Sequence, residues 1–157
     1  MSDVLAASGI DVERLLIAIR HVETASAPTG LRFEPAWMPR GYRFPLQGRE
    51  LVGTARSMTA IAEQRWVKWG PWSSASYGPW QILYHAAADL GYDGHPCDLL
   101  RLDVCRPWVE RLLHRIARQG ARTLAEIADA WNSGTHRDAI VPQEYIRRLA
   151  AAYAAAG

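Results

Sequence analysis

Hydrophobic residues recur at helical spacing in the first part of this chain. Between residues 11 and 24 the apolar positions follow the i, i+3, i+4 and i+7 pattern of a helix with one buried face. They are Val12, Leu15, Leu16, Ile19 and Val22. Asp11 precedes them and is a favourable N-cap residue. The pattern therefore predicts a helix from Asp11 to Thr24.

Apolar spacing and helix start or stop signals predict five more helices. These run from Arg49 to about Val67, from Pro79 to Gly91, from Arg106 onwards, from Thr123 to Gly134, and from Pro142 onwards. The start at Thr123 is marked by a capping box that Glu126 completes. Four prolines and three glycines interrupt the pattern between residues 27 and 48. We expect irregular structure there, with a small β element at residues 31–33.

These elements predict a mainly α fold, with five to six helices and one small irregular or β lobe. The 157 residues suffice for a single domain with one sizeable core, so we expect one domain over residues 1–157.

Charge and hydropathy exclude several classes of partner. The formal net charge is only +2, whereas nucleic-acid binding calls for basic residues clustered on one face, so no nucleic acid is expected. No apolar run reaches 18 residues, which argues against a membrane span. The first residues lack a basic stretch followed by an apolar one, so no signal peptide is expected.

The two cysteines, Cys97 and Cys105, leave two interpretations open. They could form a disulfide in an oxidising compartment or stay as buried free thiols. Histidine and cysteine do not cluster at metal-ligand spacing, so neither a metal nor a cofactor is expected.

Three short segments carry polar residue types that suit carbohydrate chemistry. Glu23 lies at the end of the first predicted helix. SYGPWQI follows at residues 76–82, and AWNSG at residues 130–134. A last segment, EYI at residues 144–146, precedes Tyr153.

The order Glu, then Ser-x-Gly-x-x-Gln, then aromatic-Asn-x-Gly resembles the lysozyme superfamily, in particular the soluble lytic transglycosylases and goose-type lysozymes. ASYGPWQI at residues 75–82, with RFE at 32–34, also resembles the phage endolysin type of N-acetylmuramidase. The similarity spans residues 10–153. It implies a lysozyme-like α+β fold around a glycan cleft. It also implies cleavage of the β-1,4 bond between N-acetylmuramic acid and N-acetylglucosamine in peptidoglycan.

Glu23 is the candidate general acid and base. Helical spacing from Leu16 and Ile19 places its carboxyl group on the apolar face, where a poorly solvated carboxyl group holds its proton more readily. Glycoside cleavage needs such a proton for the leaving oxygen. Taken alone, Glu23 is better explained by an ion pair with a nearby arginine, and only the later segments make catalysis the favoured interpretation. The transglycosylases have Ser directly after this Glu, where this chain has Thr24.

The segment at residues 76–82 is the candidate substrate-binding loop, with Tyr77, Gly78, Trp80 and Gln81. Gly78 would allow a close approach of the backbone to a sugar, and Gln81 offers a donor and an acceptor. The alternative is a turn before a helix, which would explain the Gly and the Pro alone. Among Trp66, Trp69, Trp72 and Trp80, we expect one or two to line the cleft, although tryptophan more often belongs to a core.

The resemblance assigns substrate binding to Asn132 and Tyr145 as well. Helix capping before Gly134 explains Asn132 equally well, and a place in the core explains Tyr145. Trp131 stands where the family usually has Tyr. Tyr145 could supply the missing hydroxyl group.

Glu34 is the second carboxylate of interest. It could activate a water molecule for hydrolysis if it faced Glu23, and otherwise it would be a structural ion-pair partner. We expect a lytic transglycosylase that works with Glu23 alone. The alternatives are a hydrolytic N-acetylmuramidase that uses Glu34 or water, and a non-catalytic wall-binding or phage baseplate protein.

The expected partner is the peptidoglycan glycan strand, bound by a monomer. The expected place of action is the bacterial cell wall, in the periplasm or outside the cell. Without a signal peptide, the protein would be phage-encoded or delivered by another route.

Overall fold

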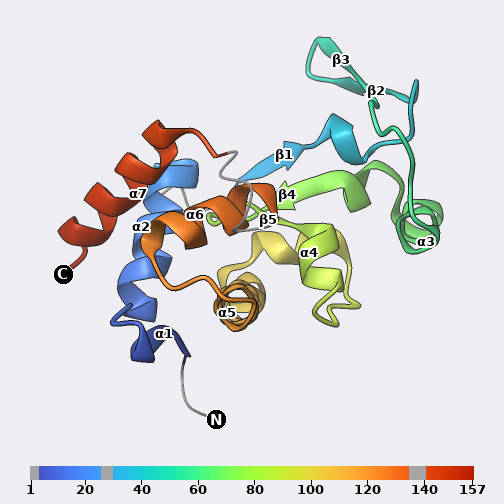
Figure 1. Cartoon of the computed structure of the whole chain (residues 1–157). Coiled ribbons are helices and arrows are strands. Elements are labelled where there is room, and N and C mark those ends of the chain that lie inside the picture. Colours follow the sequence, from blue (N-terminus) through green and yellow to red (C-terminus); the bar gives the residue numbers. More distant parts are fainter. Residues whose placement is uncertain (1–3, 26–29, 135–140) are drawn as a thin grey trace. The chain divides into compact units, whose positions relative to one another are not determined.

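The computed structural model describes residues 4–25, 30–134 and 141–157 (Figure 1). The chain forms two compact units, one made of Met1–Ala27 with Arg106–Gly157 and the other of Pro28–Cys105. We call the first the helical unit and the second the mixed unit. The single domain expected over residues 1–157 stays a prediction.

The helical unit consists of packed helices. It contains α1 (Val4–Ala7), α2 (Val12–Thr24), α6 (Leu124–Ser133), α7 (Gln143–Ala155) and most of α5 (Leu102–Arg118). Helix α7 packs against both α2 and α6. The buried apolar residues of the helical unit include Leu15, Leu16, Ile19, Val109, Leu113, Ile116, Ile127 and Leu149. The apolar faces of these amphipathic helices therefore pack together into one core, which stabilises the helical unit.

Local signals in the sequence set the helix ends of this unit. The Asp11 side chain accepts a hydrogen bond from the Arg14 N–H, as expected of an N-cap. Thr123 and Glu126 form the predicted capping box of α6, and Gly134 ends that helix in the left-handed conformation. The helices predicted at 11–24, 123–134 and after Pro142 are confirmed.

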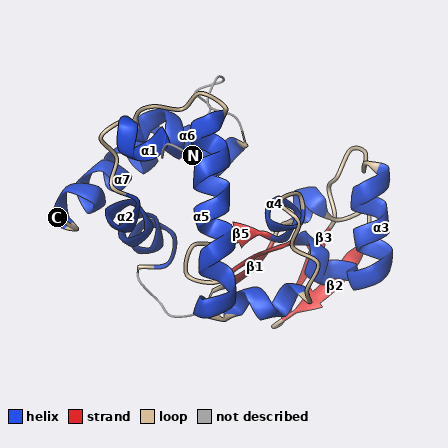
Figure 2. Cartoon of the chain, turned by 90° about the horizontal axis from the view of Figure 1, so that it is seen from below, coloured by secondary structure: helices blue, strands red, loops and turns tan. Residues whose placement is uncertain are grey.

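The mixed unit holds the strands and the short helices. Strands β1 (Leu31–Phe33), β4 (Ala75–Tyr77) and β5 (Ile82–Leu83) form an antiparallel sheet in the order β1-β4-β5, and β2 (Arg43–Leu46) pairs with β3 (Arg49–Val52). The helices are α3 (Ala60–Trp69), α4 (Tyr84–Ala88) and three 3-10 turns, η1 (Pro35–Trp37), η2 (Gly70–Ser74) and η3 (Pro96–Leu100). Figure 2 shows the strands in red. The small β element expected at residues 31–33 is confirmed.

The helix predicted from Arg49 to Val67 is wrong in its first half. Residues 49–52 are strand β3, because Gln47 and Gly48 take positive φ angles of 44° and 79° and turn the chain back onto β2. Helix α3 begins only at Ala60, after Thr59, whose hydroxyl caps the Ala62 N–H.

The helix predicted from Pro79 to Gly91 is also largely wrong. Pro79 lies in the turn between β4 and β5, where Gly78 and Gln81 have φ angles of +70° and +52° that no α-helix accommodates. Helix α4 starts five residues later, at Tyr84. Helix α5, predicted from Arg106, starts earlier, at Leu102. Helices nevertheless dominate the described residues, so the mainly α prediction with a small β lobe holds. The expected number of five to six helices is too low, because the described residues contain seven α-helices, including the unpredicted α1.

Candidate active site

Glu23 lies in the last turn of α2, in the helical unit. Its neighbours Ile19 and Val22 are buried, and Glu23 itself is half-buried, at the edge of the apolar face. Ala25 ends the helix in the left-handed conformation, and its N–H bonds to the carbonyl of His21. Thr24, at the position of the family's Ser, donates its hydroxyl hydrogen to the Arg20 carbonyl. Glu23 is therefore only half-buried, at the edge of the apolar face, and not on the buried face where its spacing predicted it.

The Tyr145 hydroxyl donates a hydrogen bond of 2.6 Å to Glu23 Oε1. The two residues are 122 positions apart in the chain, and both belong to the sequence motifs. Tyr145 is half-buried in the first turn of α7. Among the described residues, no hydrogen bond is made to the second oxygen, Oε2. Tyr145 therefore fixes one carboxyl oxygen and leaves the other available to a ligand.

A second contact joins α7 to the same end of α2. Arg148 Nη2 donates a hydrogen bond of 2.9 Å to the carbonyl oxygen of Val22. The last carbonyls of a helix have no partners within the helix, and a cation there also matches the helix dipole. Because Arg148 is three residues after Tyr145, one face of α7 holds both Glu23 and the backbone beside it. No sequence pattern singles out Arg148 for this role, because arginine is abundant in the chain.

Asp129 supports the start of α7. It is 4% exposed, and its Oδ1 accepts a hydrogen bond from the Val141 N–H, at 3.2 Å. Val141 is buried and directly precedes Pro142, whose carbonyl accepts the first bond of α7 from the Tyr145 N–H. A buried carboxylate from α6 thus helps to place the turn that carries Tyr145.

Asn132 is exposed in the last turn of α6. The Gly134 N–H closes the helix on the Ala130 carbonyl, so the Asn132 side chain is not needed for that cap. Its side chain is therefore accessible to a ligand, and its predicted role in substrate binding stays a prediction.

Glu34 belongs to the mixed unit and is tied to its own surroundings. Its Oε1 accepts hydrogen bonds from Arg32 Nε at 2.7 Å and from Ser76 Oγ at 2.9 Å. Arg32 and Ser76 are also paired across β1 and β4. Glu34 therefore works as an ion-pair and strand-linking residue, the structural role considered for it from the sequence.

The β4–β5 hairpin buries most of the predicted binding loop. Tyr77 is fully buried and Trp80 is 6% exposed, and the Tyr77 hydroxyl donates to the Trp72 carbonyl at 2.5 Å. Burial raises the Tyr77 pKa far above its ordinary value, with smaller contributions from Cys97, Tyr84 and Tyr92. Tyr77 and Trp80 thus pack in the core of the mixed unit.

Gly78 also serves the internal packing of this hairpin. A Cβ at this position would lie 2.8 Å from the Leu99 carbonyl oxygen and 3.0 Å from Cys105 Sγ. Gly78 therefore allows the close approach of the Leu99 backbone, so internal packing explains this glycine without a bound sugar.

Gln81 is the half-buried member of the loop. Its backbone N–H and its side-chain Nε2 both donate to the Gly78 carbonyl, at 3.0 Å and 2.9 Å. The side-chain oxygen has no hydrogen bond within the described residues. Gln81 can accept from a ligand while its donor holds the turn. The expected meeting of Gln81 with Glu23 joins residues of different units and stays a prediction.

Both cysteines are free thiols in this structure, with Cys105 buried and Cys97 half-buried. Burial raises the pKa of Cys105 to about 12 and also raises that of Cys97. Both thiols therefore stay protonated near neutral pH.

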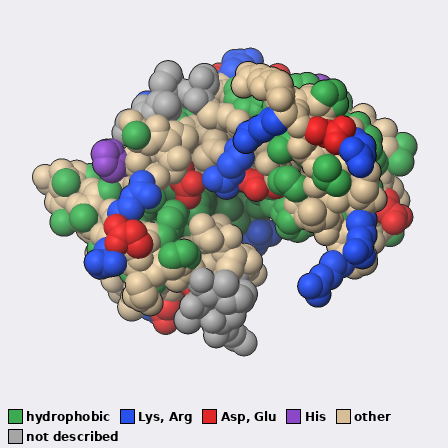
Figure 3. Space-filling model, turned by 90° about the horizontal axis from the view of Figure 1, so that it is seen from above, with side chains coloured by type: hydrophobic (Ala, Val, Ile, Leu, Met, Phe, Trp, Pro, Cys, Tyr) green, Lys and Arg blue, Asp and Glu red, His purple; other side chains and the backbone are tan. Residues whose placement is uncertain are grey.

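Other features of the described residues bear on partners. No helix in them is long and apolar enough to cross a membrane. Within the same residues, no three His, Cys, Asp or Glu side chains gather where they could hold a metal ion. Basic side chains pair with acidic ones, as in Arg43 with Glu50 and Arg101 with Asp103. Figure 3 shows the two signs interspersed on the face it presents.

Comparisons with models of known protein families, with curated proteins and with solved structures give no match to this chain.

Proposed function

We propose that this protein cleaves the β-1,4 bond between N-acetylmuramic acid and N-acetylglucosamine in peptidoglycan, with Glu23 as general acid and base. The observation that carries the proposal is the hydrogen bond between Tyr145 and Glu23 Oε1. The motif order in the sequence singled out both residues. In the fold they form one polar contact at the edge of an apolar helix face.

The reaction that fits is that of a lytic transglycosylase. Glu23 gives its proton to the glycosidic oxygen as the bond to the muramoyl C1 breaks. The resulting carboxylate then takes the proton of the muramoyl 6-hydroxyl, whose oxygen attacks C1 and closes an anhydro ring. The proton balance closes on Glu23, and no water is consumed. Tyr145 would hold Oε1, so that Oε2 carries the proton.

The state of Glu34 supports this version over hydrolysis. A hydrolase with two carboxylates needs the second one to attack the sugar or to activate water. Glu34 Oε1 is already occupied by Arg32 and Ser76. The place of action would be the bacterial cell wall. The hydrolytic and non-catalytic alternatives are distinct outcomes of the test.

The test is lysis of purified peptidoglycan, followed as loss of turbidity, by the parent protein and by Glu23→Gln. The amide keeps the size of the side chain but has no acidic proton, so activity should fall by roughly 10²–10⁴-fold. Glu13→Gln is the matched control, because Glu13 is an exposed glutamate on the same helix. Activity of Glu23→Gln within threefold of the parent would refute the assignment of Glu23, and an inactive parent would favour a non-catalytic protein.

A further inference from the structure

An exposed tryptophan lies on a buried histidine in the mixed unit. The Trp37 and His85 rings stack with centroids 4.7 Å apart and an interplanar angle of 28°. His85 is 3% exposed, whereas Trp37 is 42% exposed. One face of the indole therefore covers His85, and a large part of the rest is open to solvent. Trp37 was not among the four tryptophans that the sequence singled out.

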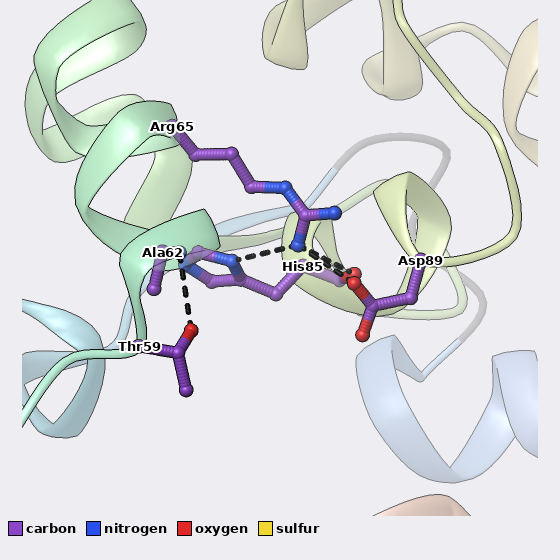
Figure 4. Close-up of polar contacts among 5 residues, drawn as sticks. All are labelled: Thr59, Ala62, Arg65, His85 and Asp89. Carbon is purple, nitrogen blue, oxygen red and sulfur yellow. Dashed lines mark hydrogen bonds and ion pairs between the residues drawn. The ribbon is translucent and has the colours of Figure 1, made fainter.

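An arginine from α3 holds the histidine of α4 in place. Arg65 Nη1 lies 3.3 Å from His85 Nδ1 and 2.8 Å from Oδ1 of Asp89, the residue that follows α4 (Figure 4). Burial and, to a smaller extent, Arg65 lower the pKa of His85, Asp89 raises it slightly, and the net value is about 4. The ring is thus neutral at pH 7. Since Nδ1 accepts from Arg65, Nε2 carries the proton, and it has no partner among the described residues.

The backbone of Trp37 is fixed as well. Its N–H donates to the Glu34 carbonyl at 2.9 Å, and its carbonyl accepts from Ser74 Oγ at 2.7 Å. The indole is therefore positioned before any ligand arrives, which lowers the entropy cost of binding to it.

We infer that the exposed part of the Trp37 ring binds a ring of a β-1,4-linked N-acetylhexosamine strand. The choice of this glycan rests on the proposed function. A sugar ring of this type has one face of C–H groups and a rim of hydroxyl and amide groups. The indole matches the C–H face. Asp89 is connected to Trp37 through Arg65 and His85, and its side chain, 52% exposed, offers an acceptor to such a hydroxyl or amide group.

The first experiment measures binding of the N-acetylglucosamine tetramer by titration calorimetry. All proteins carry Glu23→Gln, so that no cleavage occurs. Trp37→Leu keeps an apolar cover over His85 but removes the flat face, and affinity should fall roughly three- to tenfold. Trp37→Phe keeps a flat ring and should stay within about twofold of the parent. Tyr42→Leu is the control, because Tyr42 is a 37% exposed aromatic residue of the same unit. Its affinity should not change.

The second experiment needs no substitution at Trp37, so a folding defect cannot obscure it. Hydroxyl-radical labelling of the Glu23→Gln protein is followed by mass spectrometry, with and without saturating tetramer. Labelling of Trp37 should drop severalfold, and labelling of Tyr42 should stay unchanged. The inference is overturned if Trp37 labelling is the same with the tetramer, or if Tyr42→Leu weakens binding as much as Trp37→Leu.

Failure of this inference and failure of the proposed function give different results. A parent protein that cleaves peptidoglycan, while Trp37→Leu binds the tetramer as the parent does, overturns only the site at Trp37. A parent protein that cleaves nothing, while binding depends on Trp37, overturns the enzymatic proposal and keeps the site.

Discussion

The two units use their candidate residues in opposite ways. In the helical unit, Glu23 and Tyr145 come from helices at the two ends of the chain and are hydrogen-bonded to each other. In the mixed unit, Glu34 bonds to neighbouring strands and Gln81 bonds to its own turn. The hydrogen bonds of Glu34 and Gln81 hold strands and a turn of their own unit together. The hydrogen bond between Tyr145 and Glu23 instead joins two residues of the sequence motifs and uses only one of the two carboxyl oxygens.

The largest expected effect concerns the turn of the mixed unit. Gly78→Ala puts a Cβ against the Leu99 carbonyl at a φ of +70°, and should cost about 2–4 kcal/mol of unfolding free energy. Gly91→Ala is the control, because Gly91 has a φ of +102° with nothing within 4 Å of its Cβ position, and should cost about 1 kcal/mol. Urea unfolding measures both. Equal costs would mean that the close packing of Gly78 is unimportant, and would return it to the list of substrate contacts.

Lowering the pH should reduce the free energy of unfolding, because the buried His85 becomes protonated. Its folded pKa of about 4 is below the ordinary 6.5, so its contribution to stability is complete above pH 6.5 and is lost as the pH falls towards 4. The loss should be on the order of 2–3 kcal/mol. Burial is the largest cause of the lowered pKa of His85; Arg65 lowers it as well, and Asp89 raises it.

Urea unfolding at pH 7 and pH 4.5 tests this prediction. His85→Gln should lose less stability between the two pH values than the parent does, because glutamine does not titrate. His21→Gln, at an exposed position of the helical unit, should behave like the parent. A His85→Gln protein as acid-sensitive as the parent would contradict the account.

The contact in the helical unit should matter for rate more than for stability. Tyr145→Phe removes the hydrogen bond to Glu23 Oε1 and should lower kcat roughly tenfold, with less than about 1 kcal/mol of destabilisation. Tyr153→Phe is a matched control on the same helix, since its hydroxyl accepts from the Asp11 N–H at the other end of α2. It should affect stability similarly and leave kcat unchanged. If the two variants lose activity equally, Tyr145 is a packing residue.

The smallest effect is expected for Glu34. Glu34→Gln disturbs a partly exposed ion pair and should change activity by less than about threefold. The same lysis assay applies. A loss as large as that of Glu23→Gln would show that a second carboxylate takes part, and would replace the transglycosylase with a hydrolase.

Sequence reasoning predicted the helical unit well, and the reasons are physical. Its helices have apolar faces of several turns and strong caps such as Asp11 and Thr123, and these signals are local. The strands of the mixed unit are two to four residues long, too short for a period to be recognised. There the turn conformations at Gly48 and Gln81 decided the outcome, and Gln81 is not a residue type that announces a positive φ.

The candidate site divides in the same way. Helical spacing and motif order identified Glu23 and Tyr145. Arg148 and Trp37 were not predicted, because their roles depend on contacts between residues far apart in the sequence. Arg148 bonds to the carbonyl of Val22, and Trp37 stacks on the ring of His85. Tyr77 and Trp80 fit the same motif and turned out to be buried, since a motif does not say which of its residues face inward.

Mass spectrometry of peptidoglycan fragments tests the central claim most directly. Purified peptidoglycan is digested with the parent protein and with Glu23→Gln, and the glycan ends are identified by mass. The account predicts that the parent releases fragments with anhydromuramoyl ends, one water lighter than reducing ends, and that Glu23→Gln releases almost none. Fragments with reducing ends would contradict the transglycosylase reaction. Equal release by both proteins, or none by the parent, would contradict the role of Glu23 itself.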